Sequence, residues 1–267
     1  MKKLNFSEKW PDSWRYSYTY DLLEIYDSKE SLGYSYAYKN RQKHTLELIQ
    51  KVAKSGAKIL DVAAAQGNFT LTLAEMGYEV TWNDLREELI DYVKLKWESG
   101  TVHYAPGNIF DLNFDRQFDV VLIAEVIEHV AHPDEFLKNI AKMLKPDGHI
   151  VLSTPNGGYF KNDLPRFSDC PDPSQYETMQ FQPNSDGHIF LLHLDEIEKL
   201  THQAGLIVKE VRLVTNPLTN GHIKLHHLLK ALPKSWVTAF ENLTCSMPLS
   251  VKRKLHTTTV SLLTRAN

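Results

Sequence analysis

The sequence has few cysteines, no long apolar run and no excess of positive charge, and each absence excludes a class of protein. Its two cysteines, Cys170 and Cys245, allow at most one disulfide, so free thiols in a reducing compartment are expected. No apolar run approaches the length of a transmembrane helix. The formal net charge of −3 provides no cationic field for nucleic acid, and the first residues contain no apolar stretch typical of a signal peptide. These absences predict a cytoplasmic protein without a membrane span.

A full G-x-G-x-x-G fingerprint is also absent, although residues 58–85 have the pattern in which it normally occurs. Residues 59–62 predict a buried strand, and an amphipathic helix follows the small residues of the next turn. A second strand at 78–82 ends just before Asp84. This order predicts a parallel β-α-β unit, whose first turn is where nucleotide-like cofactors bind. Residues 63–67 read AAAQG, and the missing glycines weaken the case for a dinucleotide.

Strands and helices alternate along most of the chain. Apolar strands are expected at 57–62, 78–82, 102–104, 118–124, 148–153 and 206–214, with a last strand at 257–263. Helices are expected at about 40–53, 68–76, 86–97, 133–144 and 194–203. Residues 145–148 (KPDG) are expected to form a turn before the strand at 148–153. The near-continuous apolar run FDVVLIA is typical of a central strand that is buried on both faces. The alternation predicts an α/β fold with a doubly wound parallel sheet.

The chain is predicted to form a single domain over residues 1–267, with three segments outside the alternating pattern. Residues 1–39 are rich in tyrosine and tryptophan, and we interpret them as either a packed extension or a lid over a ligand. Residues 155–191 lose periodicity beyond a strand's carboxyl end, which predicts an active-site loop. Residues 216–256 are expected to be a helical insertion before the last strand, and we interpret the basic residues 252–254 as a solvated face.

Two carboxylates flank the expected ligand-binding turn. Asp61 lies two residues before the run of small residues, and Asp84 lies at the end of the second strand, 17 positions beyond Gly67. A carboxylate at the second position is suited to accept hydrogen bonds from both hydroxyls of a ribose. This spacing by itself is compatible with a dinucleotide or with S-adenosylmethionine.

The motifs LDVAAAQGNFT, TWNDL, GNIFDL and FDVVLIAEVIEHVAHPDEFLKNIAKMLKPDGHIVLSTPN resemble those of class I S-adenosylmethionine-dependent methyltransferases. EVIEHV, combined with STPN and a later histidine, resembles the branch that contains ubiquinone-biosynthesis O-methyltransferases. The resemblance covers residues 40–214. It implies a Rossmann-like, doubly wound, seven-stranded and mostly parallel sheet with helices on both faces. It also implies S-adenosyl-L-methionine as the cofactor.

The resemblance further implies where the cofactor lies. Asp84 would hold the ribose hydroxyls, and Arg41 is a candidate partner for the cofactor carboxylate. The other implied cofactor-binding residues are Asp61, Ala63, Ala65 and Gly67 beside the methionine part, Leu85, Asn108 and Ile109 beside the adenine, and Ala124 and Glu125 at the methionyl end. Ala63 and Ala65 stand where the family has glycines, and a methyl group there costs backbone freedom and space. Asn108 stands where aspartate is more frequent, but its carbonyl can still accept from an exocyclic amine.

A second group of polar residues follows the central strand. Glu125, Glu128 and His129 would share one face of a helical turn, and His188 lies in the later loop. Such a set can bind Mg²⁺ or Mn²⁺, and it resembles the metal sites of ubiquinone O-methyltransferases and small-RNA 2′-O-methyltransferases. A metal-free interpretation makes His129 a general base that Glu128 orients. Purely structural roles are the third interpretation.

Together these patterns predict a methyltransferase that modifies a hydroxyl (or amine) of a small metabolite or glycan. One alternative is a metal-dependent RNA 2′-O-methyltransferase, against which the net charge of −3 argues. Another is a non-catalytic cofactor-binding protein, which the two alanines of the turn favour. The expected partner is therefore a small-molecule methyl acceptor, and no nucleic acid is expected.

Overall fold

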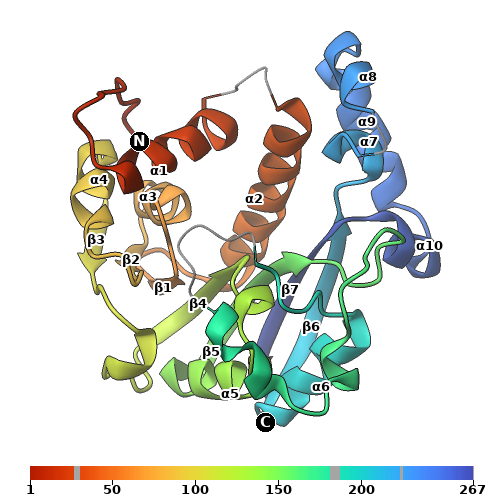
Figure 1. The fold of residues 1–267 in the computed structure, drawn as a ribbon. Helices are drawn as coiled ribbons and strands as arrows, with labels where there is room; N and C mark the ends of the chain where they lie inside the picture. Colours follow the sequence, from red (N-terminus) through yellow and green to blue (C-terminus); the bar gives the residue numbers. More distant parts are fainter. Residues whose placement is uncertain (27–30, 181–186, 223–224, 267) are drawn as a thin grey trace.

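The computed structural model describes residues 1–26, 31–180, 187–222 and 225–266. Seven strands form one sheet in the order β3-β2-β1-β4-β5-β7-β6 (Figure 1). Their bounds are β1 Lys58–Val62, β2 Glu79–Trp82, β3 Thr101–Tyr104, β4 Phe118–Ala124, β5 Leu144–Pro155, β6 Leu206–Val214 and β7 Thr258–Arg265. β7 is antiparallel to both β5 and β6, whereas the other pairs are parallel. The predicted Rossmann-like, mostly parallel seven-stranded sheet is confirmed.

The strand order reverses at the centre of the sheet, between β1 and β4. These two strands are parallel neighbours, with Val62 opposite Ile123. The chain runs outward from β1 through β2 to β3 and then returns to form β4. Loops that leave neighbouring strands in opposite directions open a crevice at the strands' carboxyl ends. The residues that follow Val62 and Ala124 therefore border the same crevice.

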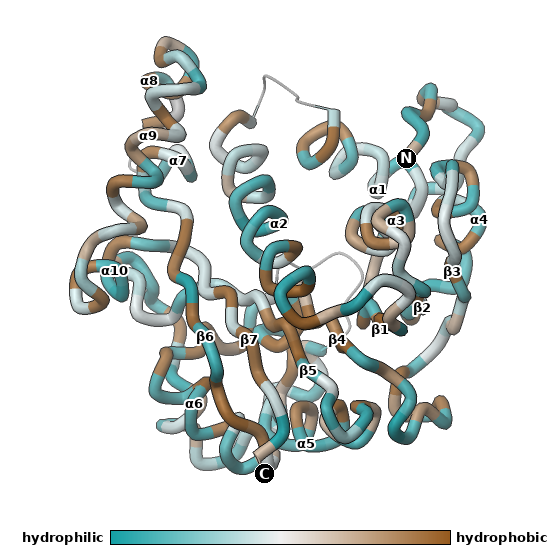
Figure 2. The backbone as a smooth tube through the Cα atoms, turned by 180° about the vertical axis from the view of Figure 1, so that it is seen from behind, coloured by the Kyte–Doolittle hydropathy of each residue, from teal (hydrophilic) through white to brown (hydrophobic). Residues whose placement is uncertain are grey.

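Helices cover both faces of the sheet. Their bounds are α1 Asp12–Glu24, α2 Leu32–Val52, α3 Asn68–Glu75, α4 Leu89–Lys96, α5 Pro133–Met143, α6 Leu194–Gln203, α7 Pro217–Asn220, α8 His226–Ala231, α9 Lys234–Cys245 and α10 Leu249–Leu255. Because strand side chains alternate between faces, Val120 packs in a core with α2 and α3, whereas Val121 packs with α5 and α6. The strands are accordingly the most hydrophobic part of the backbone in Figure 2.

The three segments outside the alternating pattern all contain regular structure. Residues 1–39 include α1 and the first turns of α2, and residues 216–256 include α7 to α10. The 155–191 segment contains the short 3₁₀ helices η3 Phe167–Asp169 and η4 Pro173–Met179. No helix within the described ranges is long and apolar enough to cross a membrane. Both cysteines are free thiols.

One predicted turn belongs to a strand. Residues 145–148 (KPDG) lie within β5, which begins at Leu144 rather than at Gly148. Phe118 pairs with Leu144, and the register then shifts so that Val120 pairs with His149. The extra residues are accommodated as an irregularity in β5, and from His149 to Ser153 the strand pairs with β4 in a regular parallel register.

Candidate active site

The turn after β1 has the backbone conformation that the missing glycines would normally provide. Ala63 and Ala65 have φ angles of 52° and 46°, and Gly67 has a φ of 74°. An L-residue other than glycine is strained in this left-handed region. A methyl group on Gly67 would also lie 2.9 Å from the side chain of Val93. The alanines therefore keep the left-handed shape of the turn with some backbone strain. Replacing Gly67 would add both backbone strain and a steric clash with Val93.

Asp84 connects this turn to the end of β2. Its Oδ2 accepts a hydrogen bond of 2.8 Å from the Ala65 amide. Arg86 binds the same carboxylate three times, through its backbone amide, Nε and Nη2, at 3.0, 2.9 and 3.1 Å. Both oxygens of Asp84 are thus engaged, and the side chain of Asp84 is only 5% exposed. The sequence pattern identified Asp84 but gave no indication of the part played by Arg86.

A cavity of about 430 Å³ opens beside this carboxylate. It lies at the carboxyl ends of β1, β2 and β4. The sequence-predicted site residues that line it are Ala63, Asp84, Leu85, Asn108, Ile109, Glu125 and His129. Its wall also contains Arg86, Phe110 and Met179, which the sequence analysis did not identify. Phe110 packs edge-to-face on Phe136 of α5, at 5.6 Å between ring centroids, so one wall of this cavity is aromatic.

Asp61 lies behind the turn rather than in the wall of the cavity. It is buried in β1, and its Oδ2 accepts a 2.6 Å hydrogen bond from the hydroxyl of Thr70 on α3. Burial raises the pKa of Asp61 to about 7, because the charged carboxylate loses its water; the Thr70 hydrogen bonds oppose this rise. Asp61 therefore fixes the first turn of α3 against the strand.

A second cavity, of about 560 Å³, lies between α2, the start of the 155–191 segment and the α7–α8 region. Arg41 lines this cavity rather than the first one, and Glu125 lines both. Arg41 Nη1 lies 2.9 Å from Glu125 Oε2, and Glu125 has a φ of 55°. A strained backbone of this kind is often found at functional sites. Glu125 thus stands at the junction of two cavities, with Ala124 just before it at the end of β4.

Three of the four residues considered as metal ligands come together. The ligand atoms of Glu128, His129 and His188 all lie within 4.8 Å of one another, and the two imidazole rings are 4.9 Å apart. Glu128 is fully buried and accepts a 2.9 Å hydrogen bond from the Thr154 hydroxyl on its Oε2. Its Oε1 is buried without a hydrogen-bond partner among the described residues. Glu125 is outside this cluster, because its carboxylate pairs with Arg41.

Glu128 and His129 differ in their surroundings. Burial, followed by the nearby charge of Glu125, raises the pKa of Glu128 well above its usual value. His129 lines the first cavity, and its Nδ1 lies 3.2 Å from the carbonyl oxygen of Gly187. His129 is therefore the member of the cluster that faces the cavity beside Asp84, while Glu128 lies behind it.

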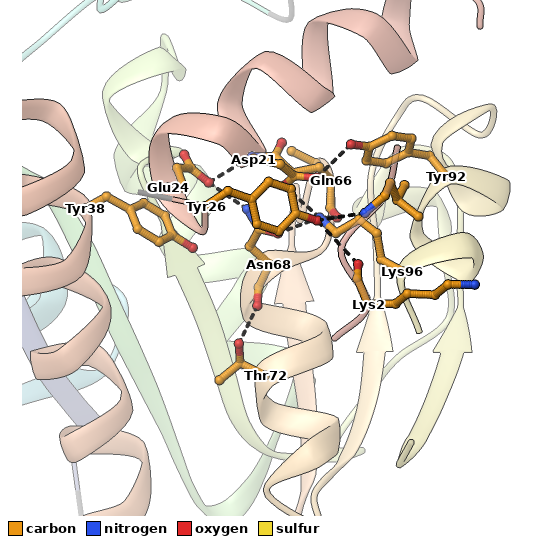
Figure 3. A network of polar contacts seen from close by, with 12 residues as sticks. Lys2, Asp21, Glu24, Tyr26, Tyr38, Gln66, Asn68, Thr72, Tyr92 and Lys96 are labelled. Atoms are coloured by element: carbon orange, nitrogen blue, oxygen red, sulfur yellow. Dashed lines mark hydrogen bonds and ion pairs between the residues drawn. The ribbon is translucent and has the colours of Figure 1, made fainter. Parts of the chain in front are cut away.

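The N-terminal segment is joined to the turn by a buried polar network, shown in Figure 3. Lys96 of α4 donates from its Nζ to Asp21 Oδ1 at 2.7 Å, to the Gln66 carbonyl at 3.0 Å and to Asn68 Oδ1 at 2.6 Å. Gln66 and Asn68 in turn donate to Glu24 Oε2, at 2.9 and 2.8 Å. The polar residues of α1, rather than its tyrosines, thus stabilise the turn after β1. None of these polar residues stands out in the sequence.

Comparison with known proteins gives a family match over most of the chain. Residues 36–211 match the family described as "Methyltransferase domain". The ubiquinone biosynthesis O-methyltransferase of Rickettsia akari is 35% identical over 104 residues, covering 38% of this chain and 41% of that protein. The enzyme of the same name from Coxiella burnetii is 34% identical over 113 residues, covering 41% of this chain and 48% of that protein. The chain thus matches less than half the length of these curated relatives.

One solved structure has a similar fold over most of the chain. The S-adenosylmethionine-dependent methyltransferase of Mesorhizobium loti superposes with a TM-score of 0.57 at 14% identity, over 84% of this chain and 96% of that one. At this identity the likeness concerns the fold alone. It shows that the two chains share an overall fold.

Proposed function

Because this chain belongs to the family of methyltransferase domains, we propose that it transfers a methyl group from S-adenosylmethionine to a hydroxyl (or amine) of a small metabolite or glycan. The observation that carries the proposal is the meeting of two cavities at Glu125. The first cavity has the carboxylate expected for a ribose, and the second has room for an acceptor. Methyl transfer requires two ligands held in line, so two joined cavities suit this reaction.

The residues of the first cavity have the chemistry that the cofactor needs. Asp84 would accept from the ribose hydroxyls, while Leu85, Asn108 and Ile109 would border the adenine. Ala63 would lie beside the methionine part, with Ala65 and Gly67 shaping the turn behind it. Arg41 is the candidate for the methionine carboxylate, which would exchange with Glu125 as its partner. When bound, S-adenosylmethionine supplies an electrophilic methyl group on a sulfonium.

Arg86 donates hydrogen bonds to the Asp84 carboxylate, which is the group proposed to bind the ribose hydroxyls. We therefore expect Arg86→Ala to bind S-adenosylmethionine about fivefold more tightly, because the free enzyme no longer has to break a partly exposed ion pair of about 1 kcal/mol. Calorimetric titration of both proteins measures this difference. Arg15→Ala is the matched control, since Arg15 pairs with Asp12 on the surface of α1. Weaker binding by Arg86→Ala would mean that Arg86 contacts the cofactor instead of competing with it.

The acceptor must lose a proton if it is a hydroxyl. His129 lines the first cavity together with Glu125, where the second cavity begins, and it would take that proton at this junction. Glu128 lies behind His129 and would orient its ring. The unpartnered Oε1 of Glu128 and the convergence of His129 and His188 also fit a divalent cation. When bound, Mg²⁺ or Mn²⁺ would lower the pKa of the acceptor hydroxyl.

Metal titration separates these two interpretations. If the cluster binds a cation, Mn²⁺ is expected to bind the wild-type protein at one site, and Glu128→Gln is expected to lose it, because a neutral amide is a far weaker ligand. Paramagnetic resonance of free Mn²⁺ measures this without any acceptor. If Mn²⁺ does not bind and a chelator leaves methyl transfer unchanged, His129 acts without a metal.

The acceptor class can be tested with radiolabelled S-adenosylmethionine. Aromatic hydroxyl compounds are the first class to screen, since the relatives from Rickettsia akari and Coxiella burnetii are named ubiquinone biosynthesis O-methyltransferases. Label incorporated into such a compound, and lost with His129→Ala, supports the proposal. Cofactor binding without transfer to any hydroxyl or amine would favour a non-catalytic role. We further propose that the protein acts in the cytoplasm, where its two free thiols would stay reduced.

A further inference from the structure

The helices α8, α9 and α10 present an apolar surface away from the sheet. On α9, Trp236, Phe240 and Leu243 recur at helical spacing and are exposed, with Trp236 68% and Leu243 58% accessible. Three more apolar side chains on the neighbouring helices are also exposed, namely Leu228 on α8 and Leu249 and Val251 on α10. In Figure 1 the four helices α7 to α10 stand at one edge of the molecule, beyond β6 and β7. We call the surface formed by these six apolar side chains the α9 face.

The orientation of α9 is fixed by its opposite side. Glu241 is buried and accepts hydrogen bonds from the amides of Thr215 and Asn216, at 2.5 and 3.1 Å. It also accepts from the Asn216 side chain and from the Thr219 hydroxyl, both at 2.7 Å. Turning α9 to bury the α9 face would leave these groups unpaired, which is costly. The apolar side chains are therefore held outward.

The same region is strongly cationic. Residues 225–256 contain five lysines and arginines, and their one acidic residue is the buried Glu241. Lys230, Lys234, Arg253 and Lys254 are exposed on the same three helices as the apolar side chains. The whole chain, in contrast, has a net charge of −3. Basic residues around exposed tryptophan, phenylalanine and leucine are typical of helices that lie in the headgroup region of a membrane.

The second cavity lies beside α7 and α8. Asn220 of α7, His222 just after α7, and Lys230 of α8 line this cavity together with residues of α2. A surface that held α8 and α9 would thus bring the cavity close to molecules dissolved in that surface. The brown and teal stretches that alternate along α8 and α9 in Figure 2 show the same combination of apolar and polar residues.

We propose that the α9 face docks onto an anionic lipid surface and that the second cavity takes its acceptor from there. The part that concerns the acceptor rests on the proposed function, whereas the docking does not. A second copy of the chain is disfavoured as the occupant, because it would bring two cationic surfaces together. A nucleic acid would satisfy the charges but would leave Leu243, Leu249 and Val251 without an apolar partner.

Vesicle sedimentation with the full chain tests the docking. The protein should pellet with vesicles of equal phosphatidylglycerol and phosphatidylcholine, and remain in solution with phosphatidylcholine alone. Leu243→Glu should weaken the binding at least tenfold, because a charge replaces an inserted apolar side chain. The matched control is Leu95→Glu, since Leu95 is 45% exposed on α4 and lies outside the α9 face. Lys234→Glu combined with Lys254→Glu should weaken binding by a similar factor and flatten its dependence on salt.

Several results would overturn the docking. If Leu243→Glu binds as tightly as wild type, or if the protein pellets equally with both vesicle types, insertion into an anionic surface is excluded. A dimer that Trp236→Glu dissociates would make a second copy of the chain the occupant. A single-stranded RNA probe that binds the α9 face more tightly than the vesicles do would make a nucleic acid the occupant. Circular dichroism of each variant checks that it is folded. If the protein pellets as expected but transfers no methyl group, the docking stands and the proposed function fails, so the two failures are distinguishable.

Discussion

Replacing Asp84 by alanine is expected to weaken S-adenosylmethionine binding on the order of 100-fold or more. A carboxylate that accepts from two ribose hydroxyls contributes roughly 1.5–3 kcal/mol for each charged hydrogen bond. Asp84 is almost fully buried at the end of β2 and already holds the Ala65 amide, so its position is set before the cofactor arrives. Isothermal calorimetry with S-adenosylmethionine measures the loss directly.

The pair Asp84 and Arg86 provides an internal control for this experiment. Arg86→Ala alone should tighten cofactor binding, and the double variant Asp84→Ala, Arg86→Ala should bind as weakly as Asp84→Ala. The two effects are not additive, because Arg86 acts only by occupying Asp84. Wild-type affinity in Asp84→Ala would show that the ribose is bound elsewhere. If the double variant binds weakly and Arg86→Ala binds with wild-type affinity, Arg86 does not compete with the cofactor, and the role proposed for Asp84 is unchanged.

The second large effect is expected for Lys96→Met, which should destabilise the fold by about 3–5 kcal/mol. The side chains of Lys96 and Asp21 are both 0% exposed, and their ion pair is 2.7 Å long. Removing the ammonium leaves the Asp21 carboxylate buried, with a 2.6 Å hydrogen bond from the Tyr92 hydroxyl as its remaining side-chain contact among the described residues. The carbonyl of Gln66 and the side chain of Asn68 also lose a donor. Urea unfolding measures the change.

A neighbouring lysine is the matched control for Lys96. Lys94 is on the same helix, pairs with Asp91 at 3.3 Å and is mostly exposed, so Lys94→Met should cost no more than about 1 kcal/mol. Because Lys96 also supports the cofactor turn, Lys96→Met should reduce cofactor affinity at temperatures where it is still folded. Equal stability of Lys96→Met and Lys94→Met would show that α1 is not held by this network.

The fold could be predicted from the sequence because its signals are local. Alternating strands and helices, a continuous apolar β4 and a turn of small residues each determine one element. Parallel connections of one handedness then leave few topologies. The KPDG segment was predicted as a turn, because proline and glycine favour turns and the sequence does not contain the register shift that places it within β5.

The candidate site was predicted in part, and the difference has a physical origin. Asp84 and the positions of Ala63 and Ala65 follow from their distance along one β-α-β unit. Arg86 was not identified, because the order of residue types does not show that its side chain folds back to bind a carboxylate two residues away. The network of Asp21, Glu24 and Lys96 joins segments that are far apart in sequence, and the burial that makes it strong appears only in the folded chain.

Glu125 illustrates the same limit. Its spacing from Glu128 suggested that both carboxylates would face one ion, on the assumption of a regular helical turn. The backbone of Glu125 is instead left-handed, and the following residues 127–129 form a 3₁₀ helix. The Glu125 carboxylate therefore does not join the cluster of Glu128, His129 and His188. The Glu125 carboxylate pairs with Arg41 of α2. The sequence predicted the helix that carries Arg41, but it did not indicate that the Arg41 side chain would reach Glu125.

The structure of the protein in complex with S-adenosylhomocysteine tests the central claim most directly. We expect the nucleoside in the cavity beside β2, with both ribose hydroxyls on Asp84 and with Arg86 turned away from that carboxylate. The thioether sulfur should then point toward Glu125 and the second cavity. A nucleoside bound in another place, or an Arg86 that keeps its bidentate pair with Asp84 in the complex, would contradict the account.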